Sequence, residues 1–183
     1  MEKVNILVVT DAQVDFHDGA LGTEEAQASV PAIVKKIKTS GDAGHLIYAT
    51  KDTHYNNYLE TMEGKNLPVP HTIIEQPGWY IVPEIEKVMQ PYDPVVIIKH
   101  TFGSIALVEA IKGRTPQCTD GKGMTITLIG WCTDICVIAN AVLLKTAFPE
   151  AEIIVDSKCC AGVTPETHNA ALTTMKSLQI TVI

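Results

Sequence analysis

The chain has 183 residues, of which 46% are hydrophobic, and it carries a formal net charge of −7. This length and composition indicate one compact domain over residues 1–183 with a sizeable buried core. The net negative charge argues against nucleic acid or an anionic membrane as the main partner, because both favour a basic surface.

Short apolar runs alternate with longer amphipathic stretches along the chain. The runs predict strands at VNILVVTD (4–11), HLIYATKD (45–52), DPVVIIKH (93–100), MTITLIGW (124–131), AEIIVDSK (151–158) and ITVI (180–183). Because they are nearly continuous in apolar residues, we expect these strands to be covered on both faces. Helical patterning predicts helices at about 24–39, 104–112, 134–147 and 165–177. The alternation indicates an α/β fold: a three-layer, doubly wound, mainly parallel sheet with helices on both faces.

Reactive side chains stand where four of these predicted strands end. The first strand ends in Asp11, the second in Asp52 and His54, and the third in Lys99, while the fourth runs into the segment GWCTDICV. Ligands of an open parallel sheet bind outside the carboxyl ends of its strands. An acid, an amine, possible metal ligands and a thiol therefore converge on one edge of the predicted sheet.

The segment GWCTDICV holds two cysteines, Cys132 and Cys136. If Thr133 caps the following helix, Cys136 lies in its first turn, where free N–H groups and the helix dipole favour a thiolate. Asp11 can then take the thiol proton and Lys99 can hold the resulting charges, so that no histidine is required. The alternative is that both cysteines are small buried hydrophobic residues.

A second cluster has the composition of a metal site. Positions i and i+2 of an extended segment point to the same side, so Asp52 and His54 can share one ion. His71 is the candidate third ligand because prolines restrict the chain before it. It ends the irregular stretch 55–71, and so long a loop in a compact domain is usually functional. The alternative is that these three are ordinary polar loop residues that bind no ion.

Several quoted segments together resemble one known family. They are VVTDAQVDF (8–16), ATKDTH (49–54), PH (70–71), IIKH (97–100), GWCTDICV (130–137) and DSKCCAGVTPETHNAAL (156–172), in the family's order. The chain resembles the isochorismatase-like cysteine hydrolases and, among them, the nicotinamidases. The resemblance implies a catalytic triad of Asp11, Lys99 and Cys136 that cleaves an amide through a thioester. It also implies a cis peptide before Cys132, with the backbone N–H groups of Cys132 and Cys136 forming the oxyanion hole.

The resemblance further implies that Asp52, His54 and His71 bind one divalent ion, zinc first, with manganese or iron as alternatives. The ion would hold the ring nitrogen of the substrate and so position its amide. Glu60 or Glu63 are candidates for a fourth protein ligand.

The substrate pocket departs in part from the family's pattern. Phe16 matches a residue that packs on the substrate, and Trp131 is bulkier than the small aliphatic residue usual at its position, which would narrow the pocket. The family's aromatic residue before His71 is replaced by Leu67 and Pro68, and Thr72 follows that histidine in place of a common cysteine.

We therefore expect an amidohydrolase of NAD metabolism that converts nicotinamide, or a close heteroaromatic amide, to the acid and ammonia. The alternatives are a metal-free family member acting on another amide, a ureide or a vinyl ether, and a non-catalytic binding subunit. The five cysteines do not form a disulfide framework and favour a reducing cytoplasm. The expected partner is a small-molecule amide, with neither nucleic acid nor membrane, and homo-oligomers are common in the family.

Overall fold

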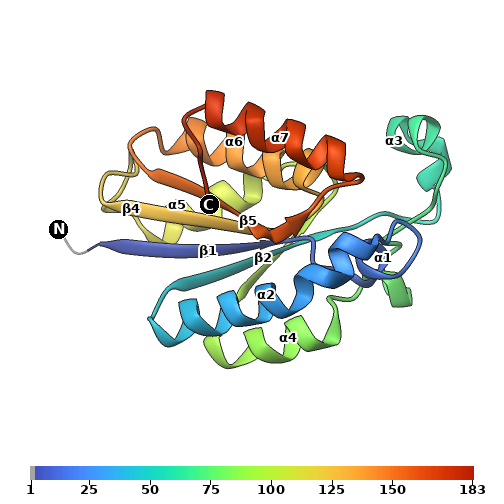
Figure 1. Cartoon of the computed structure of the whole chain (residues 1–183), viewed down its shortest axis with the longest axis horizontal. Helices are drawn as coiled ribbons and strands as arrows, with labels where there is room; N and C mark the ends of the chain where they lie inside the picture. Colours follow the sequence, from blue (N-terminus) through green and yellow to red (C-terminus); the bar gives the residue numbers. More distant parts are fainter. Residues whose placement is uncertain (1–2) are drawn as a thin grey trace.

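The computed structural model describes residues 3–183 and contains one six-stranded sheet (Figure 1). Its strands are β1 (Val4–Thr10), β2 (Leu46–Asp52), β3 (Val95–Lys99), β4 (Met124–Trp131), β5 (Glu152–Ala161) and β6 (Thr181–Val182). The spatial order is β3-β2-β1-β4-β5-β6, and all five neighbouring pairs are parallel. The predicted α/β fold is confirmed, and the sheet is parallel throughout.

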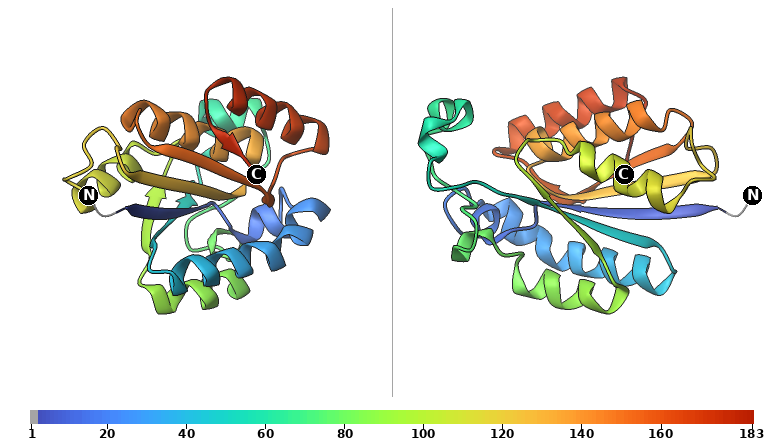
Figure 2. Two further views of the ribbon diagram at one scale, coloured as in Figure 1. Left: turned by 60° about the vertical axis from the view of Figure 1, so that its left-hand side comes forward. Right: turned by 180° about the vertical axis from the view of Figure 1, so that it is seen from behind.

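Helices cover both faces of this sheet. The α-helices are α1 (Val14–His17), α2 (Glu24–Asp42), α3 (Met62–Asn66), α4 (Pro83–Met89), α5 (Ile105–Arg114), α6 (Ile138–Ala147) and α7 (Pro165–Ser177). Short turns are η1 (Tyr58–Glu60), η2 (Pro77–Trp79), η3 (Gln90–Tyr92) and the π-helical η4 (Thr133–Val137). Helices α2 and α4 lie on one face and α5, α6 and α7 on the other, which gives the three layers expected (Figures 1 and 2). Among residues 3–183, no helix is long and apolar enough to cross a membrane.

Local signals explain how well the helix bounds were predicted. Helix α7 has the predicted bounds because Thr164 caps it, accepting from the Thr167 N–H at 3.1 Å. The predicted helix 134–147 instead starts with the π-helical turn η4, which leads directly into α6. The short helices α3 and α4 were not predicted, because five and seven residues give too few periods to recognise.

The prediction that every strand is covered on both faces is wrong for β3. Val96 and Ile98 are 45% and 49% exposed, while Val95 and Ile97 pack inward. The physical reason is that β3 lies at the sheet edge. Helix α5 packs against its inner face, and no other helix of the described chain makes comparable contact with it. An apolar run can therefore mark an edge strand as well as a central one.

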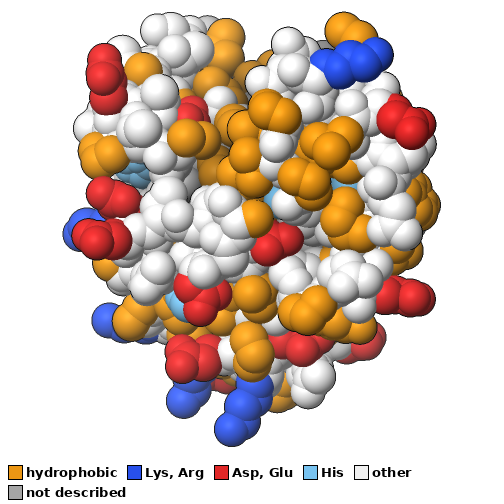
Figure 3. Space-filling view, turned by 90° about the vertical axis from the view of Figure 1, so that its right-hand side faces the viewer, with side chains coloured by type: hydrophobic (Ala, Val, Ile, Leu, Met, Phe, Trp, Pro, Cys, Tyr) orange, Lys and Arg blue, Asp and Glu red, His pale blue; other side chains and the backbone are white. Residues whose placement is uncertain are grey.

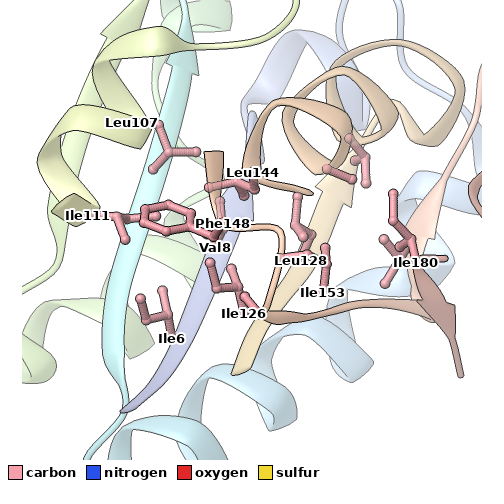
Figure 4. Close-up of a cluster of buried hydrophobic side chains, with 14 of the residues drawn as sticks. Ile6, Val8, Leu107, Ile111, Ile126, Leu128, Leu144, Phe148, Ile153 and Ile180 are labelled. Atoms are coloured by element: carbon pink, nitrogen blue, oxygen red, sulfur yellow. The ribbon is translucent and has the colours of Figure 1, made fainter. Parts of the chain in front are cut away.

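The core consists of two apolar clusters, one on each face of the sheet. Figure 4 shows part of the cluster beneath α5 and α6, where Ile6 and Val8 of β1 lie beside Ile126 and Leu128 of β4. The opposite cluster joins alternate residues of the same strands to α2 and α4. Since both faces of β1 and β4 are packed, the carboxyl ends of these central strands are held in fixed positions.

Candidate active site

Three of the predicted strand-end residues meet the thiol of Cys136 in one buried cluster. The Lys99 ammonium lies at its centre, with Nζ 2.7 Å from Asp11 Oδ2, 3.2 Å from Asp52 Oδ1 and 3.5 Å from Cys136 Sγ. All four side chains are buried. The structure thus brings together the acid, amine and thiol predicted from the sequence, and Asp52 joins them to the second cluster.

Neighbouring strands fix the position of Asp11. This residue follows β1 with a φ of 45°, and its N–H donates to the Thr50 carbonyl of β2 at 3.1 Å. The Thr50 hydroxyl donates to Asp11 Oδ1 at 2.7 Å. On the other side, Gly130 of β4 has a φ of 111°, and a Cβ there would lie 2.0 Å from the Thr10 carbonyl oxygen. Glycine therefore allows β4 to approach β1 closely at the site.

The electrostatics favour an ammonium beside a neutral thiol. Burial lowers the pKa of Lys99, but the nearby Asp11 and Asp52 carboxylates outweigh it and raise that pKa. Burial and the Asp11 carboxylate raise the pKa of Cys136 well above its usual value. The direction of this shift is opposite to the one expected for a thiol at a helix start, because burial disfavours the charged thiolate.

Burial and a neighbouring charge act in opposite directions on the pKa of Asp11. Burial raises the pKa of Asp11, while the Lys99 charge opposes this shift. Although Asp11 Oδ2 lies close to Lys99, this oxygen accepts no hydrogen bond of suitable angle from residues 3–183. The Asp11 carboxylate also lies near enough to the Cys136 thiol for its charge to raise the pKa of that thiol.

The cysteine segment differs from the expectation in its cap. Cys132 is the N-cap residue of η4, and its carbonyl accepts from the Val137 N–H at 3.0 Å, an i to i+5 bond. Thr133 does not cap the turn, because its hydroxyl is 2.8 Å from His168 Nδ1. The expected cis peptide joins Trp131 and Cys132.

The structure does not place Trp131 in the substrate pocket. Its side chain is fully buried, and its indole Nε1–H donates to the Ser29 hydroxyl at 3.0 Å. This partner lies in α2 and draws the indole into the core, away from the cavity described below. Cys132, in contrast, lines that cavity.

The predicted metal ligands also come together. One ligand atom from each of Asp52, His54 and His71 lies within 4.8 Å of the other two. His54 Nε2 is 3.0 Å from Asp52 Oδ2 and 3.5 Å from Glu63 Oε1, which is 3.7 Å from His71 Nε2. Of the two candidates for a fourth ligand, Glu63 therefore belongs to the cluster, while Glu60 is exposed on η1.

This donor set fits a divalent ion. His54 Nε2 is buried, and although Asp52 Oδ2 lies 3.0 Å away, it makes no hydrogen bond of suitable angle with residues 3–183, so it is free to coordinate. His71 Nδ1–H donates to the Val69 carbonyl at 2.8 Å, which leaves Nε2 directed at the cluster. Burial lowers the pKa of His54, but the Asp52 and Glu63 carboxylates outweigh it and raise that pKa to about 9. Two imidazoles and two carboxylates form a ligand set typical of zinc, manganese or iron sites.

A cavity of about 700 Å³ opens beside both clusters. Figure 3 shows this face of the molecule, on which hydrophobic side chains gather around a hollow. The lining residues are Phe16, Leu21, Asp52, Met62, Glu63, Asn66, Leu67, His71, His100, Thr101, Phe102, Cys132, Ile135, Cys136 and Val163. Phe16 lies there as predicted, edge-on to the His71 ring at 5.6 Å between centroids.

The sequence analysis did not identify several of the residues that line the cavity. Met62 belongs to the irregular stretch 55–71, whose length was a signal, although this residue by itself was not; Leu67, from the same stretch, lines the cavity at the position where the family has an aromatic residue. Phe102 and Val163 follow β3 and β5 at the same edge of the sheet, but isolated apolar residues carry no recognisable pattern. His100 donates from Nδ1 to the Thr53 carbonyl at 2.8 Å, so its Nε2 is left as a possible acceptor at the cavity.

One family model matches almost the whole chain. The family model described as the isochorismatase domain matches residues 5–183. A search of curated protein sequences gave no match.

Solved structures of nicotinamidases have the same fold. The pyrazinamidase/nicotinamidase from Streptococcus mutans has a TM-score of 0.83 at 25% identity, covering 98% of this chain and 99% of its own. The pyrazinamidase of Pyrococcus horikoshii, solved in complex with zinc, has a TM-score of 0.80 at 25% identity, covering 98% of both chains. The N-carbamoylsarcosine amidase from Thermoplasma acidophilum, at 24% identity, shows only that the fold is shared; its TM-score is 0.77, with 98% of this chain and 95% of its own covered.

Proposed function

The chain belongs to the isochorismatase family, and we propose that it is a cysteine amidohydrolase that converts nicotinamide, or a close heteroaromatic amide, to the acid and ammonia. One observation carries the proposal: the Lys99 ammonium contacts the Cys136 thiol and also Asp52 of the metal cluster. A scaffold protein has no use for a buried thiol, amine and carboxylate in mutual contact, so this arrangement argues against a non-catalytic binding subunit.

Asp11, Lys99 and Cys136 would form the catalytic triad. Asp11 accepts the thiol proton while the Cys136 sulfur attacks the amide carbon, and Lys99 stabilises the negative charge that develops beside it. The C–N bond then breaks, and the nitrogen leaves as ammonia with the proton from Asp11. Water adds to the resulting thioester, the carboxylic acid departs, and the thiol re-forms. Backbone N–H groups of Cys132 and Cys136 would form the oxyanion hole.

Asp52, His54, His71 and Glu63 would hold one divalent ion. When bound, the ion supplies a Lewis-acid position for the ring nitrogen of the substrate, which orients the amide without activating water. Phe16 packs against the His71 ring and would provide an apolar wall for the aromatic ring of the substrate. The finding that favours this reading over a metal-free hydrolase is the buried His54 Nε2, which lacks a hydrogen-bond partner in the described chain.

Ammonia release from a panel of amides tests the proposal. The panel holds nicotinamide, pyrazinamide, benzamide and an N-carbamoyl amino acid. We expect hydrolysis of the two heteroaromatic amides, and none by a Cys136→Ala variant. Hydrolysis of the N-carbamoyl compound alone would replace the proposal with a ureide hydrolase. The cytoplasmic location, the role in NAD metabolism and the homo-oligomeric state stay predictions, and sedimentation of the purified protein tests the last of these.

A further inference from the structure

The cavity is much larger than a single pyridine ring requires. Its volume of about 700 Å³ lies within the range of roughly 300–1,000 Å³ that is typical of pockets for drug-sized ligands. Its catalytic and metal-binding residues lie on its buried side, whereas the residues toward solvent are mostly apolar. The inference drawn from this excess space rests on the proposed function, because it uses the positions proposed there for the amide and the ring.

The two clusters fix how a pyridine-3-carboxamide would lie. Its carboxamide must reach Cys136 Sγ, and its ring nitrogen must face Asp52, His54 and His71. Asp52 and Cys136 both line the cavity and both contact Lys99, so they lie side by side on its buried floor. Nitrogen and carboxamide are meta to each other, so ring carbon 2, between them, faces this floor. Ring carbon 5, on the opposite edge, therefore points toward the mouth of the cavity.

The mouth carries an unusual set of exposed apolar side chains. Met62, Phe102 and Val163 are 72%, 48% and 50% exposed, and all three line the cavity. They come from α3 and from the segments after β3 and β5, yet they gather around one opening. Leu67 and Ile135 continue the apolar lining below them. Isolated exposed hydrophobic residues are ordinary, but a group around one opening marks a binding surface.

We propose that the substrate is a pyridine-3-carboxamide with an apolar substituent on ring carbon 5, which packs against Met62, Phe102 and Val163. Such a substituent leaves the ring nitrogen and the amide free. It removes apolar surface from water on both partners, which favours binding roughly in proportion to the area buried. Met62, Phe102 and Val163 thereby become specificity-determining residues.

The test compares kcat/KM for nicotinamide, 5-propylnicotinamide and 2-propylnicotinamide with the metal-loaded enzyme. We expect the 5-propyl amide to exceed nicotinamide on the order of tenfold, and the 2-propyl isomer to fall below both, because its chain points at the floor. Titration calorimetry with the Cys136→Ala protein provides a second readout, in which 5-propylnicotinate should bind more tightly than nicotinate.

Two exposed positions provide matched variants. Met62→Glu places a charge at the mouth and should bring the ratio of the 5-propyl amide to nicotinamide close to one. Ile105→Glu introduces the same charge at a residue that is 71% exposed and outside the cavity, so the ratio should stay as in the wild type. Equal effects of the two variants would overturn the role of the mouth.

The outcomes separate this inference from the proposed function. Hydrolysis of nicotinamide with equal or slower hydrolysis of the 5-propyl amide overturns the inference and leaves the proposed function intact. Preference for the 2-propyl isomer overturns the ring orientation. Hydrolysis of none of the three amides overturns both.

Discussion

Replacement of Thr72 by valine should weaken metal binding while preserving the shape of the site. The Thr72 hydroxyl is fully buried and donates to Asp52 Oδ2 at 3.0 Å. The same carboxylate oxygen lies 3.0 Å from His54 Nε2 and 3.6 Å from His71 Nε2. Valine has nearly the same volume as threonine but cannot donate, so Thr72→Val removes one hydrogen bond from a carboxylate of the proposed metal site.

The structure sets the size of both expected effects. A buried carboxylate that loses a donor costs about 1 to 3 kcal/mol of stability, which corresponds to a fall in Tm of roughly 2 to 12 °C for a chain of this length. Loss of a residue that orients a metal ligand typically lowers metal affinity about 10- to 100-fold. The Thr72 N–H bond to Asp15 Oδ2, at 2.6 Å, is a backbone contact that valine retains.

Competition with a chelating dye measures zinc affinity directly, and thermal unfolding of the apo and zinc-loaded proteins measures stability. Thr72→Ser is the matched control because it keeps the hydroxyl, and it should bind zinc nearly as the wild type does. If Thr72→Val lost stability but bound zinc with wild-type affinity, the hydroxyl would be a packing feature only. The reasoning that it orients Asp52 for the ion would then be refuted.

The remaining predictions concern the thiol and the ion. Cys136→Ala should abolish turnover with the fold intact, since among residues 3–183 only this sulfur makes a hydrogen-bond contact with Lys99, whereas Cys132→Ala should retain substantial activity; the reverse result would exchange their roles. Lys99→Met should slow alkylation of Cys136 by iodoacetamide, because the Lys99 charge favours the thiolate, and equal rates would argue against that electrostatic role. Removal of the ion should reduce kcat/KM for nicotinamide far more than for benzamide, which lacks the ring nitrogen, and an unchanged ratio would support a metal-free hydrolase.

The sequence allowed the convergence of the site to be predicted, because that convergence depends only on strand order and strand ends. Asp11, Asp52 and Lys99 each follow an apolar run, and in a parallel sheet such positions share one edge. No information about distant packing was needed.

Features that depend on distant contacts could not be predicted. Threonine is common at helix N-caps, which made Thr133 a candidate cap. Its hydroxyl instead forms a hydrogen bond with the ring of His168, 35 residues away. Trp131 is the last residue of β4 and matches a pocket position of the family, yet its indole donates to the Ser29 hydroxyl in the core. The thiol of Cys136 stands at a helix start, and its burial reverses the pKa shift that local structure predicts. In each case tertiary surroundings outweigh the local pattern.

Gly130 sets a limit on how this protein can vary. A methyl group at that position would meet the Thr10 carbonyl oxygen and push β4 away from β1, and these are the two strands that lead to Cys136 and Asp11. Gly113 is the natural contrast, since an added Cβ there meets nothing within 4 Å. In a saturation library scored for amide hydrolysis, position 113 should accept most residues, whereas position 130 should accept glycine alone. The distance between acid and nucleophile thus depends on a residue that has no side chain.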